Sequence, residues 1–246
     1  MAATIWTASG PVLSAAAAVW LVLGRGIFRQ REQCNSGLGI GYQEQFEVTL
    51  FELPWNTALA GERPKVDNVV DDAARARHPD REQDWFVDTS PLGPPGDFLV
   101  AQLESALYGR RNHRAYARLL TRLAFGLFAV EIVIWLVSGL SFTDYLIRLA
   151  FPSLPALQDF VFLADEHRKT AAAKENLESQ LYELLTRLES GGAVTMAECR
   201  AVQDAVYDVR RVSPSMPTWF FRQRRNHDAT AIRAAIADWS TRLTSS

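Results

Sequence analysis

The stretch LLTRLAFGLFAVEIVIWLVSGLSFTDYLIRLAFPSLPALQDFVFL, at residues 119–163, decides the fold of this chain. It contains two apolar segments, residues 119–140 and 142–163, with a polar break around residues 138–144. Each segment is long enough to cross a bilayer as a helix, which takes about 20 residues. The stretch therefore predicts a transmembrane helical hairpin. The alternative is a pair of helices buried in the core of a water-soluble protein.

Basic residues crowd both ends of this predicted hairpin. Arg110, Arg111, Arg114 and Arg118 precede it and Arg122 lies in its first turn, whereas His167, Arg168 and Lys169 follow it. Basic residues next to membrane spans stay preferentially on the cytoplasmic side. We therefore expect the hairpin to enter and leave the membrane from the cytoplasm.

A further span is predicted at the N-terminus. Residues 1–24 contain no charged side chain, and they lack the basic start that a secretory signal peptide needs. The arginines that follow, Arg25, Arg29 and Arg31, would stay in the cytoplasm. A membrane span at residues 1–28 is therefore expected, with Met1 outside the cell.

Helical spacing of apolar residues marks the rest of the chain as cytoplasmic helices. One helix is expected to end before Pro54, and another to begin at Phe98 and continue into the hairpin. In the tail, Thr195 and Glu198 have the spacing of a capping box. The predicted apolar stripes of the tail are Leu177, Leu181, Leu184, Leu185 and Leu188, then Cys199, Val202, Val206 and Val209, then Ile232, Ile236, Trp239 and Leu243. These stripes favour an internal core over a partner surface.

The predicted fold is therefore all-α, in a membrane protein of four parts. They are a transmembrane span at residues 1–28, a mostly helical cytoplasmic region at 29–118, the hairpin at 119–163 and a helical cytoplasmic domain at 164–246. The formal net charge of −2 offers no general basic surface for DNA or RNA. The sequence contains no Gly-rich phosphate loop, GxSxG or HExxH motif, and its two cysteines lack metal-site spacing. We therefore expect no enzymatic activity, no cofactor and no metal.

Polar residues inside the hairpin are candidates for gating. Glu131 and Arg148 would lie about 12 Å and about 9 Å from the break, at 1.5 Å per helical residue. At these similar depths they would form an ion pair that locks the hairpin, or a polar surface along a water-filled path between subunits. Pro152 and Pro155 are expected to break the return helix, as a simple kink or as a hinge.

Arginines mixed with aromatic residues are candidates for ligand binding. Trp219 is followed by Arg222 and Arg224, and Arg110 and Arg111 precede the hairpin. Such groups act as anchors at the membrane interface, or they bind an anionic ligand that carries bases, by charge and stacking. Topology alone also explains the arginines before the hairpin.

Several blocks together resemble the SMODS-associated four-transmembrane effector family. The blocks are Phe46 with Glu47, FELPWN at residues 51–56, DWF at 84–86, RRN at 110–112 with Tyr116, PSLP at 152–155, and finally Asp204, Tyr207, Arg210, Pro214, PTWF at 217–220 and Arg224. The resemblance covers the chain from about residue 25 onward. That family is similar in role to other membrane effectors of bacterial anti-phage signalling (CBASS).

The resemblance implies a function without catalysis. A cyclic oligonucleotide from a partner cyclase would activate a homo-oligomer in the bacterial inner membrane. The oligomer would permeabilise the membrane lipids, and the infected cell would die. If such an anionic ligand binds, the planar fork of arginine suits its phosphates, so we expect it to contact Arg110, Arg111, Arg222 or Arg224, with Trp55, Asn56 or Trp219 beside it.

Two points stay open in this interpretation. The family has four spans and the sequence shows three, so a further helix would precede residue 4, or this member has lost it. The alternative function is a membrane-anchored scaffold that binds a protein partner and conducts nothing. A membrane enzyme ranks last, because no catalytic cluster is visible in the sequence.

Overall fold

The computed structural model describes residue 19, residues 29–75 and residues 87–245, without the side chains of residues 29–36 and 225–227. Every regular element in these ranges is helical, which confirms the predicted all-α class. The predicted span at residues 1–28 lies outside the described residues, apart from residue 19.

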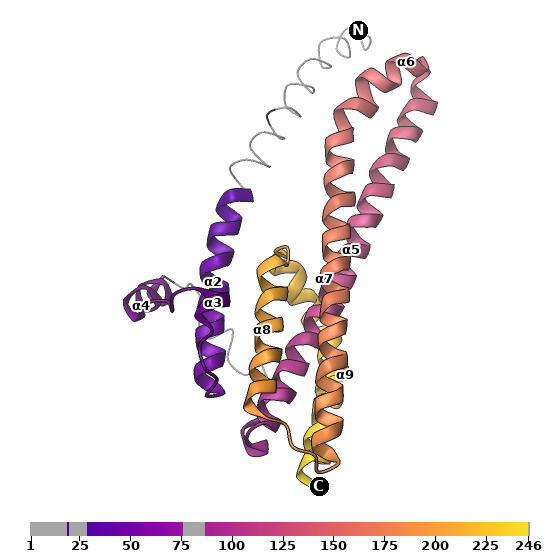
Figure 1. Ribbon diagram of the computed structural model, residues 1–246. Helices are drawn as coiled ribbons and strands as arrows, with labels where there is room; N and C mark the ends of the chain where they lie inside the picture. The colour runs from indigo at the N-terminus through magenta and orange to yellow at the C-terminus, as the bar shows by residue number, and fades with distance from the viewer. Residues whose placement is uncertain (1–18, 20–28, 76–86, 246) are drawn as a thin grey trace. The chain divides into compact units, whose positions relative to one another are not determined.

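The described helices are long in the hairpin and shorter elsewhere (Figure 1). Their bounds are α2 Arg29–Leu50, α3 Thr57–Ala60, α4 Val66–Ala74, η3 Ser90–Leu92, α5 Gly96–Ser138, α6 Phe142–Tyr145, η4 Leu146–Ala150, α7 Phe151–Glu189, α8 Met196–Val212 and α9 Thr218–Ser245. The chain divides into two compact units. We call residues 1–35 with 115–168 the hairpin unit, and residues 36–114 with 169–246 the bundle unit.

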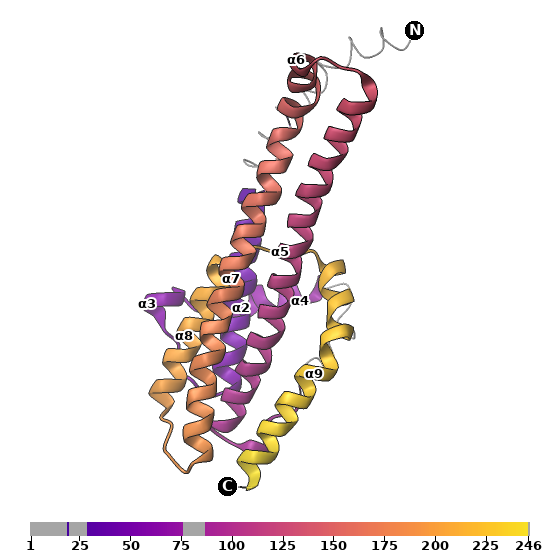
Figure 2. The ribbon, with the colours of Figure 1, turned by 90° about the vertical axis from the view of Figure 1, so that its right-hand side faces the viewer.

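The hairpin unit closes in a short polar turn between its two long arms, which run side by side in every view (Figures 1 and 2). Gly139 adopts a φ of 65°, which ends α5 with the left-handed residue that glycine favours. The Ser141 hydroxyl caps α6 by accepting from the Asp144 backbone N–H at 3.1 Å. Trp135 donates from Nε1 to the Leu140 carbonyl at 3.1 Å and packs 5.2 Å from the Tyr145 ring. This confirms the predicted break between the two apolar segments.

The apolar side chains of the hairpin face outward. Both α5 and the continuous stretch Phe142–Glu189 are long and apolar enough to span a membrane. The large exposed apolar residues include Leu123, Phe125, Phe128, Val130, Val133, Leu136, Val137, Phe142, Ile147, Phe151, Leu154, Val161 and Phe162. A helix pair in the core of a soluble protein would bury such residues. The exposed surface therefore favours the membrane hairpin over the buried pair.

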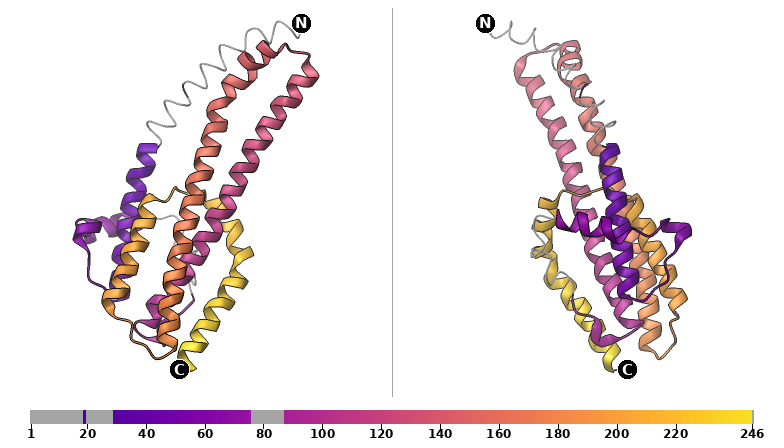
Figure 3. Two further views of the ribbon diagram at one scale, coloured as in Figure 1. Left: turned by 45° about the vertical axis from the view of Figure 1, so that its right-hand side comes forward. Right: turned by 90° about the vertical axis from the view of Figure 1, so that its left-hand side faces the viewer.

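The bundle unit has the core that the apolar stripes predict. Leu181, Leu185, Ile232 and Ile236 are fully buried in one cluster, together with residues of α2, α5 and α8. Figure 3 shows α2 and α8 beside the parts of α5 and α7 that belong to this unit. The Thr195–Glu198 capping box at the start of α8 is present as predicted. The stripes therefore serve an internal core.

Candidate functional site

The hairpin holds a buried carboxyl group, that of Glu131, for which an ion pair with Arg148 was one of two predictions. Glu131 is only 4% exposed, and its Oε1 atom has no hydrogen-bond partner among the described residues. Arg148 pairs instead with Asp144, one turn away on the same arm, at 3.0 Å. Of the two alternatives for Glu131 and Arg148, the locking ion pair is not formed, because the nearer Asp144 carboxylate binds the guanidinium. The other alternative, a polar surface along a water-filled path, stays a prediction. Glu131 is left as a polar group without a described partner, which is costly inside a membrane.

The two prolines of the return arm do not interrupt it. A π-helical turn, η4, precedes Pro152, and α7 continues through Pro155 to Glu189. The Ser153 hydroxyl donates to the Ala150 carbonyl at 3.1 Å, which satisfies an acceptor in this region. The predicted break is therefore replaced by a wider helical turn, an irregularity that often occurs at functional sites.

A buried polar network lies inside the bundle unit, between α2 and α8. Arg210 donates hydrogen bonds from both terminal nitrogens to the two carboxylate oxygens of Glu47, at 2.6 Å and 2.7 Å. Arg200 donates to Glu44 at 2.7 Å, and Gln203 donates to both carboxylates at 2.7 Å. Burial raises the pKa of Glu47, but the Arg210 charge and the hydrogen bonds outweigh it, so the pKa lies below its ordinary value. Glu47 is therefore ionised and held in place.

Lys174 of α7 packs against Gly109 of α5, next to this network. A Cβ atom at position 109 would lie 2.5 Å from Lys174 Cδ and Cε, so a larger residue there would require the end of the lysine chain to shift. The side chain is 9% exposed, and burial lowers the pKa of Lys174 to about 8, with the Arg210 charge adding to the shift. Glu47 and Glu178 oppose this shift without cancelling it. Lys174 is therefore a buried cation that loses its proton more readily than an ordinary lysine.

This low pKa predicts a pH dependence of stability. The folded pKa of about 8 lies below the ordinary value of 10.5, so the unfolded chain binds more protons between these two values. The contribution of Lys174 to the free energy of unfolding should rise by about 2 kcal/mol between pH 7.5 and pH 10. Lys174→Met should remove this rise, as measured by denaturant unfolding of the two proteins in detergent.

The comparison with Lys174→Met is needed because Cys199 titrates in the opposite sense. Burial raises the pKa of the Cys199 thiol to about 11, above its ordinary 9.0, so its contribution falls as the pH increases between these values. The unchanged protein and Lys174→Met both contain this thiol, so its contribution cancels when their free energies of unfolding are subtracted. Parallel stability curves for the two proteins would contradict the buried-cation assignment.

The structure gives most of the predicted ligand-binding residues internal partners. Trp55 donates to the Gly61 carbonyl at 2.9 Å, and Asn56 caps α3 and donates to Asp204 at 3.0 Å. Arg110 donates to Glu178 at 2.6 Å. Arg111 and Arg224 both pair with the Asp228 carboxylate, at nitrogen–oxygen distances of 3.5 Å and 2.8 Å. Trp219 and Arg222 are exposed near the start of α9. The structure thus brings together Arg111 and Arg224 but does not gather the whole set.

Residues of distant sequence blocks meet in the bundle unit. Asn56 contacts Asp204, the Pro54 carbonyl accepts from Arg200 at 2.9 Å, and Glu47 binds Arg210. The LPWN segment and the block around Asp204 therefore hold α8 against the end of α2. Their role in this structure is to build the polar network.

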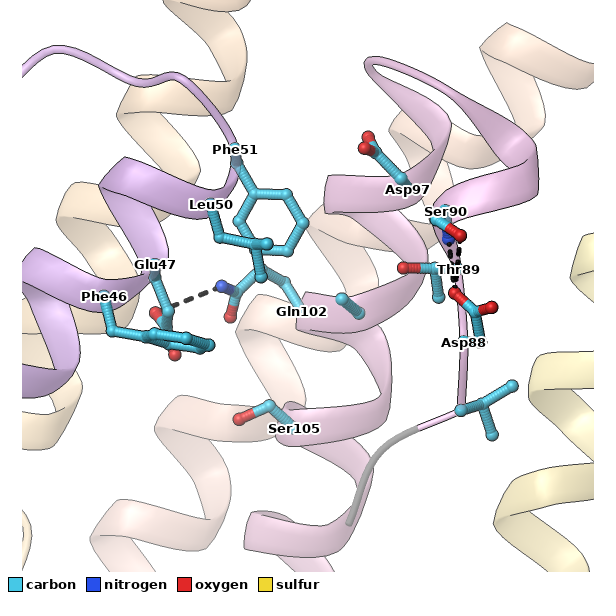
Figure 4. Close-up of a pocket in the computed structure, with 12 residues that line it drawn as sticks. Phe46, Glu47, Leu50, Phe51, Asp88, Thr89, Ser90, Asp97, Gln102 and Ser105 are labelled. Carbon is cyan, nitrogen blue, oxygen red and sulfur yellow. Dashed lines mark hydrogen bonds between the residues drawn. The ribbon is translucent and has the colours of Figure 1, made fainter. Parts of the chain in front are cut away.

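A cavity that no sequence pattern predicted opens beside the network (Figure 4). It has a volume of about 300 Å³ and lies between the end of α2, residues 87–90 and the first turns of α5. Its walls include Phe46, Phe51 and Gln102, and Gln102 donates to Glu47 at 3.2 Å. The Phe46–Glu47 block and Phe51 of the FELPWN block pointed to this region, but spacing within α2 alone could not reveal a cavity formed with α5.

Comparison with known proteins agrees with the resemblance that these blocks carry. The family described as the SMODS-associating 4TM effector domain matches residues 1–239. A protein of Bacillus cereus (strain VD146), named as a probable CBASS effector molecule, is 22% identical over 227 residues, covering 89% of this chain and 75% of that protein. No solved structure matches the chain. The chain belongs to the SMODS-associating four-transmembrane effector family.

Proposed function

We propose that this protein is an anti-phage effector that permeabilises the bacterial inner membrane when a cyclic oligonucleotide binds to it. The exposed apolar surface of the hairpin carries this proposal, because α5 and Phe142–Glu189 offer two arms that lipid could surround. The family match and the CBASS relative support the defence role. The protein would act by binding and assembly rather than by catalysis.

Glu131 supports a conducting state that differs from the arrangement described here. Its carboxyl group is buried and has an oxygen without a hydrogen-bond partner among the described residues. Several copies that assemble and move their arms could turn this group toward a water-filled path, where hydration would satisfy it. The π-helical turn before Pro152 is a local irregularity at which the return arm could adjust. A homo-oligomer is therefore part of the proposal.

Dye release from liposomes tests the proposed activity. The purified full-length protein would be reconstituted and exposed to a panel of cyclic di- and trinucleotides, with the matching linear nucleotides as the control. We expect at least one cyclic member to release the dye and its linear counterpart to leave it inside. Retention with every member would contradict the proposal and favour the non-conducting scaffold.

A further inference from the structure

A second cavity lies next to the one described above, and the two share a wall. The second has a volume of about 390 Å³ and is lined by Tyr42, Gln45, Phe46, Thr49, Leu50 and Val69. Phe46 and Leu50 line both cavities, although these side chains are 64% and 57% exposed. An exposed aromatic ring between two hollows can offer a stacking surface to planar groups on either side.

Each cavity is lined by a glutamine whose side-chain oxygen accepts no hydrogen bond from the described residues. The Oε1 atoms of Gln102, in the first cavity, and of Gln45, in the second, are buried and accept no hydrogen bond from the described residues. Gln102 is 3% exposed, and its Nε2 donates to Glu47 at 3.2 Å and to Gln203 at 3.0 Å. These two bonds fix the amide so that its oxygen remains as an acceptor. Both oxygens expose almost no surface, so a ligand with an N–H group would satisfy them only after the side chains that cover them move aside.

The acidic lining of the first cavity disfavours the phosphate groups of a nucleotide. Its carboxylates are Glu47, Asp88 and Asp97, and the described residues that line the two cavities include no lysine or arginine. Hydrogen bonds from the Ser90 hydroxyl and backbone N–H lower the pKa of Asp88 below its ordinary value, which keeps it ionised. Phosphate groups would be repelled from these cavities. A base edge with N–H donors has the opposite character and fits their acceptors.

We propose that these paired cavities bind two bases of one cyclic oligonucleotide, one on each side of Phe46 and Leu50. This inference rests on the proposed function and locates its ligand site. Gln102 and Gln45 each accept a hydrogen bond from a base, Phe46 provides the stacking surface, and the phosphates stay in solvent at the rim. Each cavity is at the small end of the range for ligand sites, roughly 300–1,000 Å³, which suits a base rather than a whole nucleotide. Guanine and adenine, whose larger rings stack more extensively and whose amino groups add N–H donors, are preferred over uracil, which has one N–H donor on its pairing edge.

Phe46→Ala tests this site without disturbing the buried core. We expect the full-length variant in detergent to bind cyclic dinucleotides of guanine or adenine at least tenfold more weakly than the unchanged protein. Leu38→Ala is the matched control, since Leu38 is a 58% exposed apolar residue of the same helix that lines neither cavity, and its affinity should be unchanged. Ser105→Phe adds bulk to the first cavity and should weaken binding as well. Titration calorimetry would measure the affinities, and the cyclic diuridine nucleotide should bind the unchanged protein most weakly of the three.

The outcomes separate this site from the proposed function. If a cyclic nucleotide releases dye while Phe46→Ala and Ser105→Phe bind it as tightly as the unchanged protein, the site is wrong and the function stands. If binding is sensitive to Phe46 but no dye is released, the site stands and permeabilisation fails. If the unchanged protein binds no cyclic nucleotide, the site is overturned. A Phe46-dependent dimer without nucleotide binding would instead make this surface an interface between copies.

Discussion

Replacing Arg210 with alanine should lower the free energy of unfolding by about 3–5 kcal/mol, because it leaves the Glu47 carboxylate buried without its counter-ion. Glu47 is 8% exposed, and Arg210 alone reaches both of its oxygens with a pair of charged donors. In a chain of this size such a loss corresponds to a fall in melting temperature of roughly 6–20 °C. Thermal unfolding of the purified protein in detergent, followed by tryptophan fluorescence, would measure it.

The neighbouring arginine provides the control for this experiment. Arg211 pairs with Asp208 at 3.1 Å, but both side chains are more than half exposed. Water screens such a pair, so Arg211→Ala should change the stability by less than about 1 kcal/mol. Equal shifts for the two variants would show that the Glu47–Arg210 pair is not a buried ion pair.

Replacing Val130 with arginine should prevent normal insertion of the first hairpin arm. Val130 is 55% exposed and lies near the middle of the apolar segment 119–140. An arginine at the centre of a membrane helix makes insertion less favourable by about 2.5–3.5 kcal/mol. We expect less protein in the membrane fraction and less nucleotide-dependent dye release, with a glycosylation assay reporting the position of residues 138–144.

The same substitution distinguishes lipid from water around the hairpin. If water surrounds Val130, an exposed arginine should change stability by no more than about 0.5 kcal/mol and leave the protein in its former fraction. Val212→Arg is the control, because Val212 is 72% exposed at the end of α8 in the bundle unit. Full tolerance of both substitutions would contradict the membrane interpretation and the function that depends on it.

Local patterns account for the parts of this protein that could be predicted. Apolar segments of sufficient length predicted the two arms, and the Thr195–Glu198 spacing predicted the start of α8. Each of these features depends on residues within a few turns of one another. Their geometry therefore follows from helical periodicity and backbone hydrogen bonding, which the sequence shows directly.

The ion-pair partners of the charged side chains could not be predicted from local patterns in the same way. The similar depths of Glu131 and Arg148 suggested an ion pair, but Asp144 lies one turn from Arg148 and binds it. Arg110 and Arg111 were candidates for an anionic ligand, and carboxylates of α7 and α9 hold them. The charge of a side chain is visible in the sequence, whereas the nearest opposite charge depends on how the helices pack.

The amino-acid sequence by itself determined the helical class, the apolar hairpin and the family of this protein, because these depend on composition, spacing and blocks read along the chain. Only the tertiary structure decided that Glu47 meets Arg210, that Lys174 lies over Gly109 and that two cavities flank Phe46. These features join residues far apart in the chain. Packing of α2, α5, α7 and α8 creates their distances, burial and pKa shifts, and no single helix contains that information.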